Sequence, residues 1–123
     1  MKIKQLVICI LLQSLFFVSC SQKINCDQLS LNFTSYEKAL AEIKSAQFKI
    51  KESVNTSKSS WIKNASYFSC NGETGFFIFE TAKKKYLYSS MPYSIWLEFK
   101  NAESLGSYYN DKIKHNYIFT LSK

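Results

Sequence analysis

The first twenty residues decide how much of the chain is left to fold. Two lysines precede an apolar run from Leu6 to Val18, which is followed by Cys20. A basic region before an apolar run of about 7–15 residues is typical of an export signal. A membrane-spanning helix needs about 20 apolar residues, and this run is shorter and contains Gln13. We therefore predict a signal peptide over residues 1–19, with a retained anchor helix as the alternative.

The residues at the end of the apolar run indicate how the signal is processed. Phe17, Val18 and Ser19 stand directly before Cys20. This arrangement resembles the lipobox of bacterial lipoproteins, although leucine is usual where Phe17 stands. In that family the cysteine thiol receives diacylglycerol and becomes the first residue of the mature chain. The resemblance implies a lipidated Cys20, export, and anchoring to a membrane of the cell envelope, in the periplasm or at the outer membrane. Otherwise Cys20 is an ordinary thiol.

The remaining residues, 20–123, suffice for one small domain. They contain 14 lysines, no arginine and nine acidic residues. Such a basic balance suits an anionic membrane surface, an acidic polymer or nucleic acid, or it serves solubility alone. The absence of arginine weighs against nucleic acid, because the planar guanidinium is the preferred partner of phosphates and bases.

Cys26 and Cys70 are the two cysteines left after the signal and the lipidation candidate are set aside. In an oxidising compartment an even pair is expected to form a disulfide. The bridge would close a loop of about 45 residues, which the chain-entropy model values at about 4 kcal/mol. Two buried free thiols and a metal pair are the alternatives. The metal pair is the weakest, because the lone His115 provides no zinc-type ligand spacing.

The first part of the mature chain divides into a tether and a short folded segment. Residues 20–31 are polar and are predicted to be a tether. Residues 32–58 are predicted to hold a helix and a strand. Thr34 and Glu37 have the spacing of a capping box, and apolar residues then repeat at helical spacing from about Ser35 to Ala46. Phe48, Ile50 and Val54 alternate with polar residues, as in a strand.

The second part is richer in strands. We predict strands over residues 61–70, 76–79 and 85–88, with a turn at Asn71 and Gly72 and another from Thr81 to Lys84. A helix is predicted to begin at Pro92, capped by Ser89 or Ser90, and to end near Asn101. A short helix follows Ser104, and Ile118 and Phe119 form a last edge strand. The predicted fold is α+β: a single domain in which a small antiparallel sheet of three to five strands packs against two or three helices.

A set of residues in the second part of the chain carries a family resemblance: Ser60, Ile62, Tyr67, Tyr86-Leu87-Tyr88, Pro92, Trp96, Phe99, the run from Ala102 to Asn110, Ile113, Lys114 and Tyr117. Through these residues, positions 59–117 resemble the KTSC domain, a small family found at the C-terminus of some lysyl-tRNA synthetases and as single-domain bacterial proteins. We therefore assign a KTSC-like domain to residues 59–120, in one folded unit with residues 32–58. The resemblance implies no established activity, and RNA binding is the function that the synthetase context implies.

Seven aromatic residues lie between Lys85 and Asn110. Tyr86 and Tyr88 share one face of a strand, which would suit two stacked bases. It suits packing under the helix that carries Trp96 and Phe99 equally well, and we expect the aromatic residues to form mainly the core. Gly106 is interpreted as a close helix–strand contact. The candidate binding residues are Tyr86, Tyr88, Lys83, Lys84, Lys85, Tyr108, Tyr109 and Lys114.

The sequence contains no recognisable catalytic constellation. His115 is the single histidine, and no nucleophile motif, zinc motif or phosphate-binding glycine loop is present. We expect no enzyme activity, no cofactor and no metal. Two functions remain. The first is a lipid-anchored envelope protein whose basic, aromatic-rich domain binds a protein or an acidic polymer. The second is a nucleic-acid-binding module.

Overall fold

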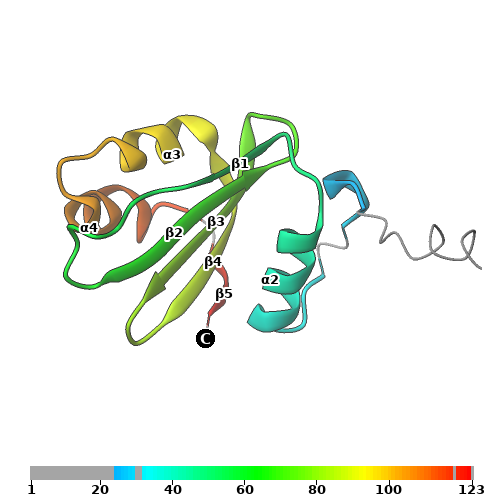
Figure 1. Ribbon diagram of the computed structural model, residues 1–123, viewed down its shortest axis with the longest axis horizontal. Coiled ribbons are helices and arrows are strands. Elements are labelled where there is room, and N and C mark those ends of the chain that lie inside the picture. Colours follow the sequence, from blue (N-terminus) through cyan, green and yellow to red (C-terminus); the bar gives the residue numbers. More distant parts are fainter. Residues whose placement is uncertain (1–23, 30–31, 118, 123) are drawn as a thin grey trace, which may run out of the picture.

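The computed structural model describes residues 24–29, 32–117 and 119–122. These residues form one antiparallel sheet whose five strands lie in chain order. The first four strands are joined by turns and loops, and the fifth returns beside the fourth after the C-terminal helices (Figure 1). The strands are β1 (Ile50–Ser53), β2 (Ile62–Ser69), β3 (Thr74–Thr81), β4 (Lys85–Pro92) and β5 (Phe119–Ser122).

Helices precede and follow the strands. In chain order they are the 3-10 turn η2 (Cys26–Gln28), α2 (Tyr36–Ser45), α3 (Tyr93–Lys100), α4 (Leu105–Tyr108) and the π-helical turn η3 (Tyr109–Ile113). The predicted α+β fold is confirmed. The described residues form five strands and three α-helices, within the predicted three to five strands and two or three helices. In the described ranges, no helix has both the length and the apolar character needed to cross a membrane.

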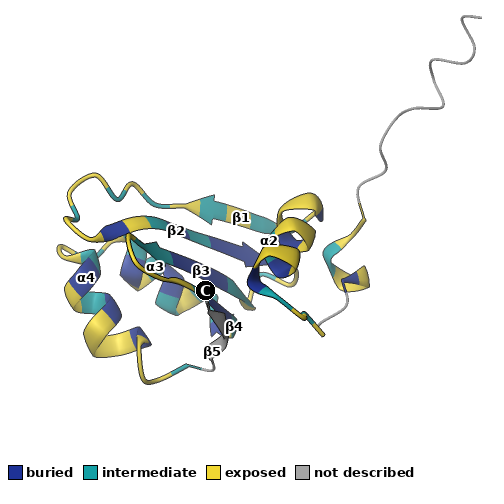
Figure 2. Cartoon of the chain, turned by 90° about the horizontal axis from the view of Figure 1, so that it is seen from below, coloured by how far each residue is buried: buried dark blue, intermediate teal, exposed yellow. Residues whose placement is uncertain are grey.

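Both faces of the sheet are covered. Successive side chains of a strand point to opposite faces, so the apolar run in β3 places Phe77 and Phe79 on one face and Ile78 on the other. Helices α3 and α4 lie over the first face, here called the α3 face, and helix α2 lies over the second, the α2 face (Figure 1). Figure 2 shows buried residues along the neighbouring strands β2 and β3.

The α3 face holds the larger core. Tyr67 of β2 stacks on Trp96 of α3 with 5.6 Å between ring centroids, and the Tyr67 hydroxyl donates to the Met91 carbonyl at 2.8 Å. Trp96 and Phe99 are fully buried, so the expectation that the aromatic stretch is mainly core is confirmed there. The buried residues are Ile62, Ala65, Tyr67, Phe77, Phe79, Tyr88, Met91, Trp96, Phe99, Tyr109 and Ile113.

The core of the α2 face is smaller. Helix α2 packs Ala39 and Ile43 onto the sheet, where both are fully buried. The Tyr36 hydroxyl donates to Glu80 Oε1 at 3.0 Å, which ties the first turn of the helix to the end of β3. The buried residues of this face are Leu29, Tyr36, Ala39, Ile43, Ala46, Phe68, Ile78 and Leu87.

The residues before α2 are attached to the domain rather than free. Cys26 and Cys70 form a disulfide with 5.7 Å between their Cα atoms, a usual separation for such a bridge. The Cys26 N–H donates to the Gln47 carbonyl at 3.0 Å, and the Gln47 N–H donates to the Ile24 carbonyl at 2.9 Å. The disulfide prediction is confirmed over free thiols and a metal pair. The predicted tether over residues 20–31 is wrong for residues 24–29, which belong to the folded unit.

Two helices begin within one residue of the predicted positions, but their predicted caps are wrong. Helix α2 is capped by Ser35, whose hydroxyl accepts from the Lys38 N–H at 3.2 Å, so the predicted box of Thr34 and Glu37 is wrong. Helix α3 begins at Tyr93 without a side-chain cap, because β4 continues to Pro92, paired with Thr74. Ser89 and Ser90 therefore lie in the strand.

The turn at Gly72 and the last strand agree more closely with the sequence-based predictions. Gly72 has a φ of 81° in the predicted turn, and the Asn71 side-chain carbonyl accepts from the N–H groups of Glu73 and Thr74 at 2.8 and 3.0 Å. The predicted edge strand is β5, which begins at Phe119, whereas Ile118 lies outside the described residues.

Candidate binding site

Two of the tyrosines predicted as binding residues are part of the core. Tyr88 and Tyr109 are 2% and 4% exposed, and their hydroxyls share a hydrogen bond of 2.7 Å. Tyr109 also stacks on Phe79 with 3.8 Å between ring centroids. Burial raises the pKa of both phenols, so they stay neutral. A ligand cannot stack on either ring without opening the core, so Tyr86 and Tyr88 do not form a two-ring platform.

Tyr86 lies at the surface hollow that the structure forms at the β3–β4 turn. The ring is half-buried and lines a cavity of about 430 Å³. We call this cavity the hairpin hollow; its other lining residues are Trp61, Thr81, Ala82, Lys83 and Lys84. It combines two aromatic rings with two lysines, and no acidic residue lines it. Its lining gives an anionic ligand flat apolar contact and positive charge in one place.

The turn itself holds the lysines at the rim. The Thr81 hydroxyl accepts from the N–H groups of Lys83 and Lys84 at 3.2 and 2.9 Å, and the Thr81 N–H donates to the Lys84 carbonyl at 2.8 Å. These bonds fix the backbone of the turn, while the side chains of Lys83, Lys84 and Lys85 are exposed. The predicted lysine cluster is therefore available at the surface next to Tyr86.

Trp61 is the member of the hollow that sequence reasoning missed. Its side chain is 36% exposed although it stands directly before β2. The ring contacts Phe79 and Tyr109 at centroid distances of 5.8 and 6.1 Å. A Cβ at Gly106 would lie 2.7 Å from Trp61 Nε1, so the glycine makes room for the indole. Gly106 of the KTSC-like motif was the one available signal, and its close contact is with this side chain.

The remaining candidates lie away from the hollow. The Tyr108 hydroxyl donates to Glu98 Oε2 at 3.1 Å, and burial together with this bond raises the pKa of Tyr108 to about 12. Lys114 is exposed after η3 and does not line the cavity. Of the eight predicted binding residues, the structure brings Tyr86, Lys83 and Lys84 together at the hollow, with Lys85 adjacent in the chain.

Trp61 also borders a second recess, of about 280 Å³, on the side of the 54–60 loop. Lys58, Lys100 and Glu103 line it together with several serines. Because it carries both signs of charge, and because Lys100 is already paired with Glu52, it has less preference for an anion than the hairpin hollow.

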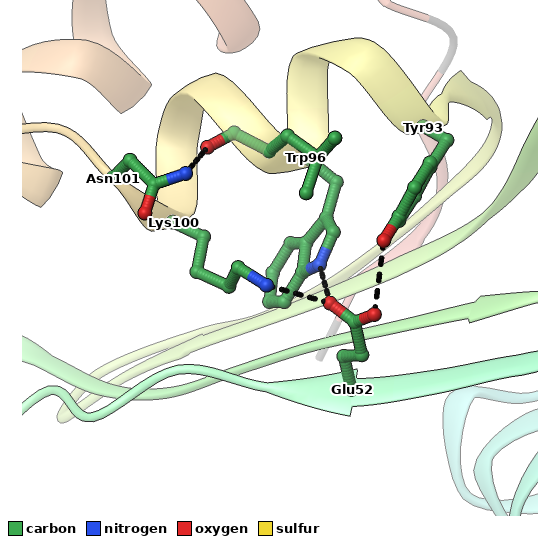
Figure 3. A network of polar contacts seen from close by, with 6 residues as sticks. Glu52, Tyr93, Trp96, Lys100 and Asn101 are labelled. Atoms are coloured by element: carbon green, nitrogen blue, oxygen red, sulfur yellow. Dashed lines mark hydrogen bonds and ion pairs between the residues drawn. The ribbon is translucent and has the colours of Figure 1, made fainter.

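Glu52 is the best-connected charged residue of the described part, and it was not predicted. Its Oε1 accepts from Trp96 Nε1–H and from Lys100 Nζ, each at 2.9 Å, and its Oε2 accepts from the Tyr93 hydroxyl at 3.0 Å (Figure 3). The bond from Trp96, followed by that from Lys100, holds the pKa of this carboxyl below its ordinary value of 4.5.

These contacts make Glu52 a clamp between β1 and α3. Tyr93, Trp96 and Lys100 follow one another at spacings of three and four residues, which places them on one helix face. A carboxylate with three donors, one of them a paired cation, is stabilised in its ionised form and is a poor general acid or base. Within the described ranges, no three His, Cys, Asp or Glu side chains lie together as a metal site would require.

The comparison with protein-family models gives one match, to the KTSC domain, over residues 77–117. The predicted resemblance is confirmed over this segment, which runs from the middle of β3 to the residues after η3. Trp61 and Glu52 lie outside the match, whereas Tyr86 and the three lysines of the turn lie inside it. Neither the curated proteins nor the solved structures contain a match to the chain.

Proposed function

We propose that this protein is exported and anchored through a lipidated Cys20, and that its KTSC-like domain binds an anionic partner at the hairpin hollow. The partner is an acidic polymer or an acidic protein surface. The observation that carries the binding proposal is the meeting of Trp61, Tyr86, Lys83 and Lys84 around one cavity. No catalytic role is proposed.

Two features support the envelope location. The first is the basic and apolar leader that ends at Ser19 and Cys20. The second is the Cys26–Cys70 disulfide, since disulfides persist in the periplasm and at cell surfaces and are rare in the cytosol of most organisms. A diacylated cysteine carries two chains, and two chains hold a protein to a membrane stably where a single chain is marginal.

The chemistry of the hollow supports weak, charge-driven recognition. Lysine is a compact point charge that attracts anions without fixing their orientation, and its contribution falls as salt screens it. The rings of Trp61 and Tyr86 add apolar contact area beside the charges. We expect binding that depends strongly on salt and little on the sequence of the polymer.

Nucleic acid is the alternative partner, and one feature of the hollow favours it. An exposed tryptophan beside lysines can stack on a base, which is worth about 1–3 kcal/mol per base. Against this, Tyr88 is buried and the chain contains no arginine. The hollow therefore offers Trp61 and the half-buried Tyr86 in place of the Tyr86 and Tyr88 pair to which the sequence had pointed.

The anchor is tested by fractionating the producing cells and measuring the intact mass of the membrane-extracted protein. We expect a mature chain that begins at Cys20 and carries acyl mass, and release or loss of processing on Cys20→Ala. A soluble mature chain without acyl mass would refute the anchor.

The binding site is tested by titration with heparin and with poly-uridine at low and at physiological salt. We expect similar weak binding to both, lost as salt rises because counterions are no longer released favourably. Replacing both Lys83 and Lys84 by alanine should lower the salt slope by about 1 for each contacting lysine. The matched control is the double variant Lys112→Ala, Lys114→Ala, which removes the same charge outside the hollow.

The same titration separates the two partners. Poly-uridine binding that persists at physiological salt, exceeds heparin binding and falls on Trp61→Ala or Tyr86→Ala would establish the nucleic-acid alternative. An equal loss of polyanion binding in the two double-lysine variants would show that the attraction is general. The hairpin hollow would then not be the binding site.

A further inference from the structure

A second apolar cavity lies on the α2 face, next to the disulfide. Its volume is about 310 Å³, at the lower end of the range for small-molecule sites. We call it the phenylalanine pocket, because four phenylalanines line it. Its lining residues are Cys26, Phe33, Phe48, Phe68, Cys70, Asn71, Thr74, Gly75, Phe76, Ser89 and Ser90.

The four rings form a cluster that the protein covers incompletely. Phe33 contacts Phe76 at 6.0 Å, and Phe48 contacts Phe68 and Phe76 at 5.5 and 6.3 Å between centroids. Phe68 is buried, but the other three are only half-buried. By contrast, Phe77, Phe79 and Phe99 on the α3 face are fully buried. The pocket is thus an apolar surface with room for a further apolar group.

The backbone at the pocket is unusual at two lining residues. A Cβ at Gly75 would collide with the Phe68 carbonyl oxygen, so glycine allows β2 and β3 to approach closely there. Ser90 at the rim has a φ of 58°, the one positive φ of a non-glycine residue among those described. Strained backbone of this kind persists where the surrounding structure fixes it, and it clusters at ligand sites.

The charges around the pocket suit an anionic surface. Lys51 Nζ lies 5.8 Å from the centroid of the Phe68 ring, and Lys49 Nζ would lie 3.4 Å from a Cβ at Gly72, the residue after Asn71 of the rim. No acidic residue lines the pocket. The apolar interior suits an acyl chain. The rim of serine, threonine and asparagine and the two neighbouring lysines suit the negatively charged headgroup above that chain.

The position of Cys26 ties the pocket to the proposed anchor. Cys26 lines the pocket and is bonded to Cys70 in its wall. Cys20 is six residues earlier in the chain, and six residues span at most about 20 Å when fully extended. A lipid on Cys20 would therefore hold the pocket mouth at the membrane surface, where the local concentration of acyl chains is high.

We propose that the phenylalanine pocket binds an acyl chain of an anionic phospholipid in the membrane that carries the anchor. This inference rests on the proposed lipidation of Cys20, because the short spacer selects a lipid over other apolar ligands. Lipid binding at this pocket would orient the domain on the membrane. The pocket lies at the start of β3 and the hairpin hollow at its end, so docking the pocket on the bilayer points the hollow away from it.

The test uses the membrane-extracted protein in vesicles of phosphatidylcholine and phosphatidylglycerol that contain a phospholipid with a photoactivatable acyl chain. Crosslinked residues are mapped by peptide mass spectrometry. We expect the labels to concentrate on Phe33, Phe48 and Phe76 and to be absent from Trp61. The Thr74→Trp variant fills the mouth with an indole and should reduce pocket labelling at least about fivefold. Ser94→Trp, at an exposed position of α3, is the matched control and should leave it unchanged.

The acyl mass of the N-terminal peptide is read in the same sample, so the two proposals fail separately. An unmodified Cys20 with labels in the pocket would refute the anchor and leave lipid binding in place. Labels spread evenly over the surface, or labels in the pocket that Thr74→Trp does not reduce, would overturn the inference. A third result would also overturn the inference: the pocket stays unlabelled, and sedimentation shows a dimer that Thr74→Trp dissociates. Should Thr74→Trp not fold, the label map of the parent protein decides.

Discussion

The two faces of the sheet are built by different principles. The α3 face is filled with interlocking aromatic rings, and its polar atoms are paired with one another, as in the Tyr88–Tyr109 and Tyr67–Met91 bonds. The α2 face has a smaller, more aliphatic core under one helix, a disulfide at its edge and an apolar cavity beside it. The large rings at the centre of the first face are fully buried, and its uncovered apolar surface lies at the edge, beside lysines in the hairpin hollow. The second face leaves three of its four clustered phenylalanines half-buried.

The difference follows the family match. The matched residues, 77–117, supply most of β3, the whole of β4 and the helices α3, α4 and η3 over the α3 face. Helix α2, strands β1 and β2 and the segment that carries Cys26 come from outside the match. The KTSC segment thus provides most of the α3-face core, which β2 completes with Ile62, Ala65 and Tyr67. The N-terminal residues cover the other face and carry the features that separate this chain from a bare KTSC domain.

The largest predicted effect is on the α3 face. Trp96→Ala should lower the free energy of unfolding by about 3–5 kcal/mol, the usual range for emptying a buried aromatic site. It also removes a donor from Glu52. Urea denaturation followed by circular dichroism measures the change. Trp61→Ala is the control, because this ring is one-third exposed, and we expect a clearly smaller loss. Equal losses in the two variants would contradict the contrast between the core and the hairpin hollow.

The next effect concerns the α2 face. Replacing Cys26 and Cys70 together by alanine should lower the free energy of unfolding by about 2–4 kcal/mol, since the bridge joins residues 44 apart in the chain. The loss should be local. Amide exchange should quicken in η2 and α2, while α3 keeps its protection. Alkylation before reduction gives an independent check: labelling of both thiols in the native protein would disprove the disulfide.

The third effect lies in the clamp that joins the N-terminal strand to the α3 face. Glu52→Gln should cost about 1–3 kcal/mol, because the amide offers one acceptor oxygen where the carboxylate offers two, to Trp96 and to Tyr93, and because the ion pair with Lys100 is lost. Glu42→Gln, at an exposed position of α2, is the control and should change the stability by less than about 0.5 kcal/mol.

The clamp also predicts a pH dependence. The pKa of Glu52 is lowered in the folded state, so its contribution is complete above the ordinary value of 4.5 and is lost as the pH falls through the lower folded pKa. The parent protein should therefore lose stability below about pH 4.5 more steeply than Glu52→Gln. Parallel stability curves in acid would show that the carboxylate carries no net stabilisation.

How far the sequence predicts the structure can be judged from particular residues. The strands, the turn at Gly72 and the helix with Trp96 are encoded by local patterns, so their positions were predicted within a few residues. The cap of α3 was not predicted correctly, because pairing of Pro92 with Thr74 extends β4 through Ser89 and Ser90, and that pairing is a property of the sheet. The disulfide was predicted from compartment and count alone.

The sites were less predictable because they depend on contacts between distant segments. Trp61 and Tyr86 meet across β2, β3 and β4, and Glu52 meets Trp96 44 residues away. Nothing in the local pattern distinguishes the buried Tyr88 from the half-buried Tyr86, since both point to the α3 face. What separates them is η3, whose Tyr109 covers one of the two rings.

The smallest predicted effect is at the rim of the phenylalanine pocket. Ser90 has a φ of 58°, which costs a non-glycine residue roughly 1–2 kcal/mol, while glycine loses about 0.5–1 kcal/mol more backbone entropy on folding. Ser90→Gly should therefore raise the free energy of unfolding by roughly 0–1.5 kcal/mol, the difference of these two effects. Ser94→Gly, in the exposed interior of α3, is the matched control and should lower it by about 0.5 kcal/mol. Urea midpoints of the two variants, measured side by side with the parent, show whether each substitution raises or lowers the stability.

If Ser90→Gly destabilises the protein as much as Ser94→Gly, the backbone at the rim is unstrained, and the proposed pocket loses one of the observations that support it. If it stabilises the protein and also weakens lipid labelling, the strain at Ser90 holds the pocket open for its ligand.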